Sequence, residues 1–199
     1  MLQLSTDDIL ESILGPDTSL GSSQFIESFL EMVAKCLQST RTPSKSLFRC
    51  NFCDFLVKVI RISFEKAVVL AVQILKDLIL RLDEETYLQF MTVSEDGVKD
   101  PSGRNLIDGM LSKLEHSSTT TIKEILQLLE TMFEFETQRN AYGMYRSRMN
   151  EEGIKEKPAI EYVQTHPDVQ VFETHCQHAN KEVSEKCYTL IKDYLTHDI

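Results

Sequence analysis

Apolar residues recur at intervals of three and four along most of the chain, which is the pattern of helices that bury one face. The clearest amphipathic helix runs from Ser22 to Gln38. Its apolar stripe is formed by Phe25, Phe29, Met32, Val33, Cys36 and Leu37. The segment from Phe64 to Leu82 is apolar on more than one side, so we expect a helix buried between neighbours. The whole pattern predicts helices at 6–14, 22–38, 45–64, 64–82, 83–91, 105–115, 118–136, 159–164, 167–177 and 180–195.

Polar segments that contain glycine or proline separate the predicted helices. The clearest loop is Thr92–Gly103, and a second polar stretch at 137–153 precedes the last helices. The 199 residues include only 7 glycines and 5 prolines, which favours long helices over a sandwich or barrel with many turns. We therefore expect one helical domain over 1–199, with N-terminal helices at 1–91 and a C-terminal group at 104–199.

Two helical hairpins in the C-terminal group resemble each other. In each, an apolar helix ends at a histidine, His116 or His178, and a few small polar residues lead into a second helix. The second helices carry matching apolar positions at the spacing of one helix face. These positions are Ile122, Leu126, Leu129 and Phe133 in one hairpin and Val183, Cys187, Leu190 and Tyr194 in the other. Such repeats stack, so we predict an all-α, right-handed α-solenoid of three to four armadillo or HEAT-like repeats.

The segment Glu173–Leu190 holds two histidines and two cysteines, and three interpretations are open. It could be a metal site, a catalytic Cys/His pair, or the packed interior of a helical hairpin. Cys187 occupies the position that Leu126 has in the other hairpin. A cysteine at such a position packs as a small apolar side chain, so the hairpin interior is the favoured interpretation.

A metal or catalytic site has less support. Zinc sites use three or four ligands, and only His175 and His178 could share one helix face here. Cys50 and Cys53 form an isolated CxxC without a second pair. The cysteines of 173–190 fall within helices rather than at a helix N-terminus, where thiols become nucleophilic, and no common catalytic motif occurs. We expect no catalytic residue, no metal and no cofactor.

Charge restricts the kind of partner. The net charge is -10 and the pI is about 5.0, and basic residues form no stripe. This argues against nucleic acid and favours a protein or a basic or mixed-charge peptide. The most apolar stretch, Ala67–Leu80, is too short and polar to span a membrane, and we see no basic leader at the N-terminus. The odd number of cysteines, 5, argues against a disulfide framework, so we expect a cytoplasmic and/or nuclear protein.

The C-terminal group resembles the last armadillo repeats of importin-α. "HANKEVSEKCYTLIKDYL", from His178 to Leu195, is similar to the final repeat, and "LIDGMLSKLEHSSTTTIKEILQLLETMF" to the one before it. "EEGIKEKPAIEYVQTHP" resembles the segment that leads into the final repeat. The resemblance implies an armadillo stack and a link to nuclear transport. Importin-α binds basic localisation signals with paired Trp and Asn residues, and this chain has no Trp, so the signal-binding array is not implied.

The sequence thus predicts a non-enzymatic protein-interaction scaffold or adaptor. Stacked repeats bind partners along the concave face, which the second helix of each pair lines. The outward polar positions of these helices give the candidate partner-binding residues Lys123, Gln127, Glu130, Glu134, Glu185, Thr189 and Lys192. These side chains could instead only solvate the helix surface. The chain could also be a helical regulatory subunit of a larger complex or, with least support, a Cys/His enzyme.

Overall fold

The computed structural model describes residues 20–39, 52–62, 64–91, 102–141 and 157–196. All regular structure in these ranges is helical. The α-helices are α2 (Leu20–Ser39), α4 (Phe52–Ile62), α5 (Glu65–Ile79), α6 (Glu84–Met91), α7 (Ser102–Leu114), α8 (Thr119–Ala141), α9 (Pro158–Gln164), α10 (Val171–His175) and α11 (Lys181–Leu190). A 3-10 turn, η1 (Pro167–Gln170), precedes α10, and a π-helical turn, η2 (Ile191–Leu195), continues α11.

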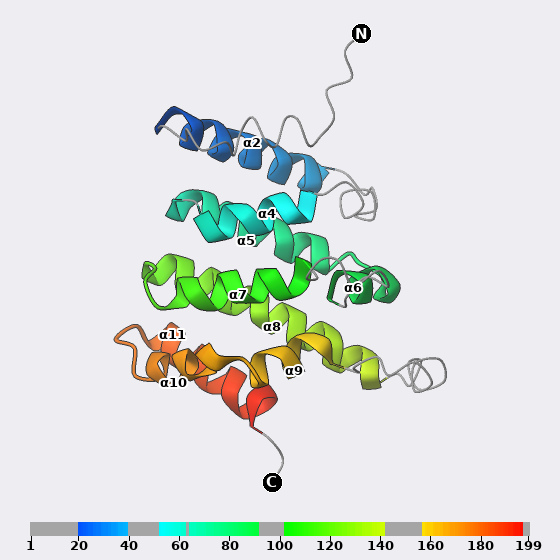
Figure 1. The fold of residues 1–199 in the computed structure, drawn as a ribbon, viewed down its shortest axis with the longest axis vertical. Helices are drawn as coiled ribbons and strands as arrows, with labels where there is room; N and C mark the ends of the chain where they lie inside the picture. The colour runs from blue at the N-terminus through cyan, green and yellow to red at the C-terminus, as the bar shows by residue number, and fades with distance from the viewer. Residues whose placement is uncertain (1–19, 40–51, 63, 92–101, 142–156, 197–199) are drawn as a thin grey trace.

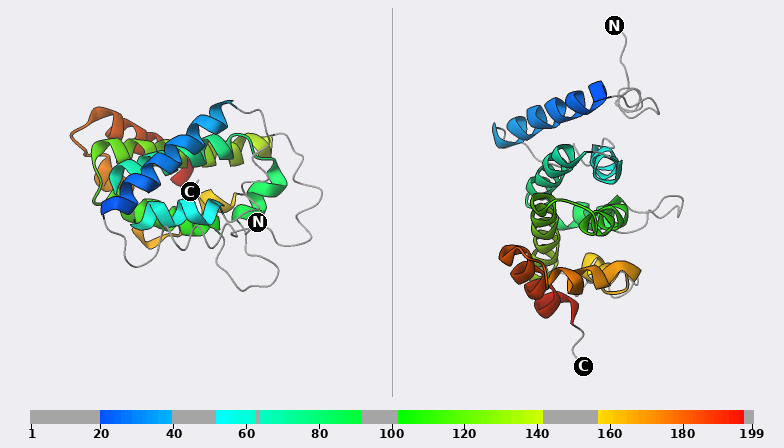
Figure 2. Two further views of the ribbon diagram at one scale, coloured as in Figure 1. Left: turned by 90° about the horizontal axis from the view of Figure 1, so that it is seen from above. Right: turned by 90° about the vertical axis from the view of Figure 1, so that its left-hand side faces the viewer.

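The helices stack along one axis in two layers (Figures 1 and 2). In one layer α2 packs on α5, α5 on α8, and α8 on α11. In the other layer α4 packs on α7, and α7 packs on α9. The stack begins at α2 and ends at α11 with η2, at opposite ends of the long axis (Figure 1). This arrangement confirms the prediction of an all-α solenoid, in which each unit packs against its neighbours.

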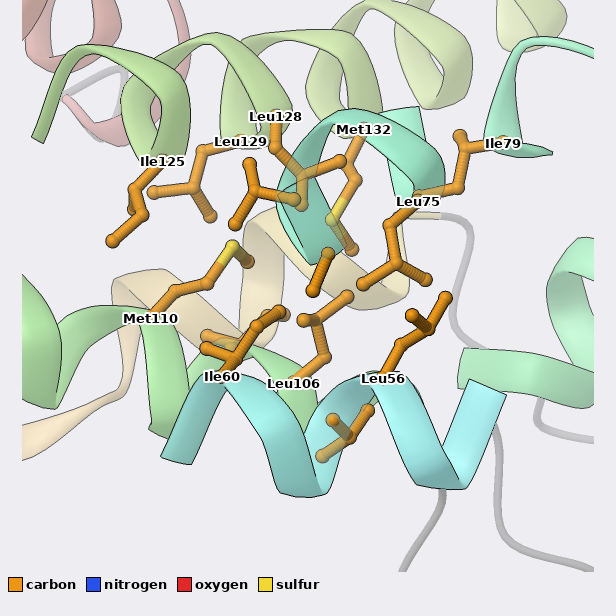
Figure 3. Close-up of a cluster of buried hydrophobic side chains, with 14 of the residues drawn as sticks. Leu56, Ile60, Leu75, Ile79, Leu106, Met110, Ile125, Leu128, Leu129 and Met132 are labelled. Carbon is orange, nitrogen blue, oxygen red and sulfur yellow. The ribbon is translucent and has the colours of Figure 1, made fainter. Parts of the chain in front are cut away.

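The core lies between the two layers. Leu56 and Ile60 of α4 and Met110 of α7 point across the layers toward Leu75 of α5 and Leu129 of α8 (Figure 3). All five side chains are fully buried. Helix α5 is apolar on more than one side because it lies between α2 and α8 and also packs on α4. The prediction of a helix buried between neighbours is therefore confirmed, although α5 ends at Ile79 and not at the predicted residue 82, and Phe64 and Leu80 at its two ends are exposed.

Two predicted boundaries were wrong. Helix α7 begins at Ser102, so Gly103 lies within a helix and not in the predicted loop 92–103. Helix α8 continues to Ala141, so the first part of the predicted stretch 137–153 is helical. Its polar residues are compatible with a helix, and Thr137 and Gln138 are exposed to solvent. The remaining loop residues, the predicted helix at 6–14 and the start of the one at 45–64 lie outside the described residues.

The apolar stripe predicted for 22–38 is only partly buried. The side chains that face the core are Ile26, Leu30 and Leu37, while Phe25 and Met32 are 55% and 54% exposed. Helix α2 stands at the end of its layer and has α5 on one side (Figure 1). Its apolar surface is wider than the side that α5 covers, which explains why the prediction was wrong for Phe25, Met32 and also the exposed Cys36.

Gly103 permits the close approach of α7 to the end of α6, and Gly103→Ala is expected to lower the free energy of unfolding by about 1–3 kcal/mol. A Cβ at position 103 would lie 2.8 Å from the carbonyl oxygen of Phe90, which cannot swing aside as a side chain can. The matched control is Gly109→Ala, where the nearest atom is Cγ of the exposed Arg61 at 2.9 Å. Urea unfolding should show a loss for Gly103→Ala and none for Gly109→Ala. Equal losses would contradict the role of the Phe90 carbonyl.

Candidate protein-binding surface

Ion pairs link successive helices of the layer that contains α2, α5, α8 and α11. Each junction joins a lysine of one helix to a carboxylate of its neighbour. The pairs are Lys66 with Glu27 (3.1 Å) and Glu31 (3.0 Å), Lys76 with Glu124 (3.6 Å), and Lys186 with Glu130 (2.5 Å). Lys123 also pairs with Glu182. These pairs are partly exposed, so each contributes modestly to stability.

Three of the predicted partner-binding residues belong to these junctions. Lys123 and Glu130 hold α11 against α8, and Gln127 accepts a hydrogen bond from Nζ of Lys76 at 2.9 Å. All three are half-buried, so the expectation that Glu130 is exposed was wrong. The reason is that the polar face of α8 also contacts the polar faces of α5 and α11. The main contact of these three side chains is with neighbouring helices.

The remaining predicted residues differ in exposure. Glu134 and Lys192 are exposed, and Thr189 is half-buried. Glu185 is exposed and pairs with Lys181, one turn before it on α11, at 3.3 Å. Glu134 and Lys192 are thus the predicted residues that are most accessible to a partner.

Tyr194 of η2 contacts α8 at a place where acidic residues neighbour the two contacting rings: Glu134 follows Phe133 in α8, and Asp193 precedes Tyr194 in η2. Burial raises the pKa of Tyr194, and the negative charges of Glu134, Glu130 and Asp193 raise it further. Glu134 and Asp193 are exposed, whereas the ring of Tyr194 packs on Phe133 with the centroids 5.4 Å apart. The surface here combines an aromatic ring with two accessible carboxylates, which is suited to a lysine or arginine side chain.

The Cys187 thiol is part of the core. Its side chain is fully buried, as is Leu126 at the matching position of the other hairpin, so the packing interpretation is confirmed. Burial raises the pKa of Cys187 to about 12, and the nearby Cys176 raises it further. A thiol with so high a pKa is protonated at neutral pH and is a poor nucleophile. Cys176 is half-buried, and burial raises its pKa as well.

The two histidines of this segment have structural roles, His175 toward α7 and His178 within the turn of the hairpin. His175 is buried, and its Nε2 donates to the carbonyl oxygen of Leu114 at 3.0 Å. Nδ1 of His178 accepts from the backbone N–H of Asn180 at 2.9 Å, and the two imidazole rings stack 5.7 Å apart. Asn180 in turn caps α11 by accepting from the N–H groups of Glu182 and Val183. His178 therefore supports the turn between α10 and α11.

Two kinds of feature are absent from the described part of the chain. Among its His, Cys, Asp and Glu side chains, no three lie in an arrangement that could hold a metal ion. None of its helices has the length and apolarity that crossing a bilayer requires. Cys50 of the isolated CxxC lies outside the described residues.

Sequence reasoning missed a buried carboxylate, Glu136, that joins three helices. Its Oε1 accepts from the hydroxyl of Tyr87 on α6 and from the N–H of Ala159 on α9, both at 2.8 Å. Its Oε2 accepts from the N–H of Ile160 at 3.2 Å. The side chain thus satisfies two of the unpaired N–H groups in the first turn of α9, a helix for which Lys157 provides no side-chain cap. The signal in the sequence was a Glu three residues after Phe133, on the apolar face of α8.

A second missed cluster fixes η1 to α7. The hydroxyl of Tyr162 donates to Asp108 at 2.7 Å, and Nε2 of His166 lies 3.2 Å from the same carboxylate oxygen. Nδ1 of His166 accepts from the N–H of Asp168 at 3.1 Å, so Nε2 carries the proton that it donates to Asp108. Both ring nitrogens of His166 therefore have partners, and the cluster fixes the start of the last repeat.

Comparison with known proteins gives few matches. No protein-family model and no curated protein matches the chain. Among solved structures, the chain matches a designed armadillo repeat protein, YIII(Dq.V1)4CPAF, in complex with peptide (KR)4. The two are 15% identical, the match covers 94% of this chain and 98% of the designed chain, and the TM-score is 0.30. The assignment to the α-solenoids therefore rests on the observed stack of helices.

Proposed function

We propose that this protein is a non-enzymatic scaffold or adaptor that binds a basic segment of a partner protein at the surface of α8 and α11. The observation that carries the proposal is the contact of Tyr194 with Phe133, which brings η2 onto α8 where the exposed residues Asp193 and Glu134 adjoin the two rings. A lysine or arginine of the partner would place its charge between the two carboxylates and its aliphatic stem along the ring. The net charge of -10 would favour the approach of such a segment.

The chemistry of the Cys/His segment supports binding over catalysis. The Cys187 thiol is held in its protonated form, and His175 is buried with its Nε2 directed at a backbone carbonyl. Nucleophilic catalysis needs an accessible nucleophile with a base in hydrogen-bond reach. Neither residue offers that arrangement.

The resemblance of 104–199 to importin-α repeats supports a partner in nuclear transport, with the protein in the cytoplasm and/or nucleus. Affinity capture of the full chain from cytosolic and nuclear extracts, followed by mass spectrometry, tests this part of the proposal. Recovery of transport factors with basic segments would support it. Recovery of one stable complex in fixed stoichiometry would instead favour a helical regulatory subunit of that complex.

The binding site itself is tested by charge reversal. Glu134→Lys is expected to weaken the binding of a short fluorescent Lys/Arg peptide about fivefold or more, because it replaces an attraction by a repulsion. Glu173→Lys is the matched control. Glu173 is also exposed and the variant changes the net charge equally, but the residue lies on α10, away from the proposed site. Fluorescence anisotropy at several salt concentrations should show weaker binding at high salt.

Two outcomes would contradict this site. Equal losses in Glu134→Lys and Glu173→Lys would mean that net charge alone attracts the peptide. Unchanged binding in both variants, together with a normal helical circular dichroism spectrum, would place the basic segment on another surface.

A further inference from the structure

The N-terminal end of the stack carries an uncovered apolar stripe. Phe25 and Met32 of α2 are both more than half exposed, and the half-buried Phe29 lies between them on the same side of the helix. Phe29 also contacts Phe55 of α4, with their ring centroids 5.9 Å apart. We call Phe25, Phe29 and Met32 the α2 stripe. It lies next to α4 on the side of α2 that the described helices leave open to solvent.

The opposite end of the stack has a different surface. On α11 and η2 the exposed positions at the same helical spacing are Lys181, Glu185 and Tyr188 of α11 and Lys192 of η2, three of which are charged. A polar outer face is what terminal units of a solenoid use to remain stable in water. By this criterion the α11 end needs no cover, whereas the α2 stripe exposes two large apolar side chains that another helix could bury.

The chain itself contains a segment of suitable length and pattern. Residues 1–19 lie outside the described part and connect directly to Leu20 at the start of α2. Their sequence predicts a helix at Thr6–Leu14 with Ile9, Leu10 and Ile13 on its apolar side. A helix this short is marginal in water unless it packs on another surface. Gly15 and Pro16 follow it and favour a turn that would reverse the chain.

Charge favours an antiparallel arrangement. If the predicted helix runs back along α2, its start lies near the C-terminal half of α2. That start carries Asp7 and Asp8, and the C-terminal half of α2 carries the exposed Lys35, which flanks the α2 stripe. Lys35 also helps Lys66 to lower the pKa of Glu31, so its positive charge acts on carboxylates at this part of the helix.

We propose that residues 6–14 dock on the α2 stripe as a helix antiparallel to α2 and close the N-terminal end of the stack, with Asp7 and Asp8 beside Lys35. This inference is independent of the proposed function, which concerns α8 and α11. Among the described helices, only α2 carries both a phenylalanine and a methionine that are more than half exposed. The proposal assigns an intramolecular partner to these two side chains.

The proposal is tested in the full-length chain by hydrogen exchange of the α2 amides. Ile13→Glu is expected to accelerate exchange in α2 about tenfold, because it removes the apolar contact that protects this end of the stack. Ser12→Glu is the matched control, since it adds the same charge on the adjacent polar position of the predicted helix. It should leave exchange in α2 unchanged. Lys35→Glu should accelerate exchange by a smaller factor, and D7K together with D8K should reverse that effect.

Three outcomes would overturn the proposal. Exchange in α2 that is the same in Ile13→Glu and Ser12→Glu would show that this segment does not cover the stripe. Sedimentation velocity could show a dimer that Met32→Glu converts to a monomer, while the control Leu80→Glu, at another exposed apolar residue, does not. That result would assign the stripe to a second copy of the chain. Failure of the D7K and D8K changes to offset Lys35→Glu would exclude the antiparallel arrangement.

Discussion

Phe133→Ala is expected to lower the free energy of unfolding by about 3–5 kcal/mol, among the largest effects of any single substitution in the described core. The Phe133 side chain is fully buried on α8, where its ring packs on Tyr194 of η2. Truncation removes the apolar contacts of the ring and leaves a cavity between α8 and η2, which the surrounding helices can fill only in part. Because α11 packs mainly on α8 and α10, we expect its amides to lose protection first.

Phe64→Ala provides the matched control for this prediction. It makes the same chemical change at a side chain that is 61% exposed, so we expect a loss below about 0.5 kcal/mol. Urea unfolding followed by far-UV circular dichroism compares the two variants, and hydrogen exchange locates the change. A loss in Phe133→Ala as small as that in Phe64→Ala would mean that η2 does not pack on α8 in solution.

The fold was predictable because each inner helix carries an apolar face that only a stack can bury. The equivalence of Cys187 and Leu126 followed from spacing alone, and both are fully buried. The end of the stack was less predictable. Helix α2 has apolar positions on both its Ile26 side and its Phe25 side, and spacing cannot decide which of them a neighbour covers.

The candidate binding residues were predictable only in part, because ion pairs between helices depend on the relative alignment of those helices. Lys123 and Glu130 look like solvent-facing residues in the sequence, yet each pairs with a residue of α11 more than fifty positions away. Glu134 on the same helix is exposed. The contact of Tyr194 with Phe133, next to Glu134, depends on how η2 crosses α8, which periodicity does not specify.

Glu136 joins α6, α8 and α9, and its titration should make stability depend on pH. Burial raises its pKa from 4.5 to about 7, and the nearby charge of Glu161 on α9 acts in the same direction. The hydrogen bonds from Ala159, Ile160 and Tyr87 act in the opposite direction, since they stabilise the carboxylate. Because the pKa is higher in the folded state, the folded protein binds this proton more tightly than the unfolded chain does.

The stabilisation that Glu136 provides is therefore largest below about pH 4.5 and decreases as the pH rises to about 7. Above that pH the titration of Glu136 no longer changes the free energy of unfolding. Over that window the loss is about 3 kcal/mol. Glu136→Gln removes the titration but keeps an oxygen that can accept from Tyr87 and Ala159. As the pH rises through this window, wild type should therefore lose about 3 kcal/mol of unfolding free energy relative to Glu136→Gln.

Urea unfolding of both proteins at a series of pH values measures this difference. Glu134→Gln controls for the loss of a carboxylate from the surface of α8. Parallel pH profiles for wild type and Glu136→Gln would contradict the prediction and would mean that the three donors offset the effect of burial.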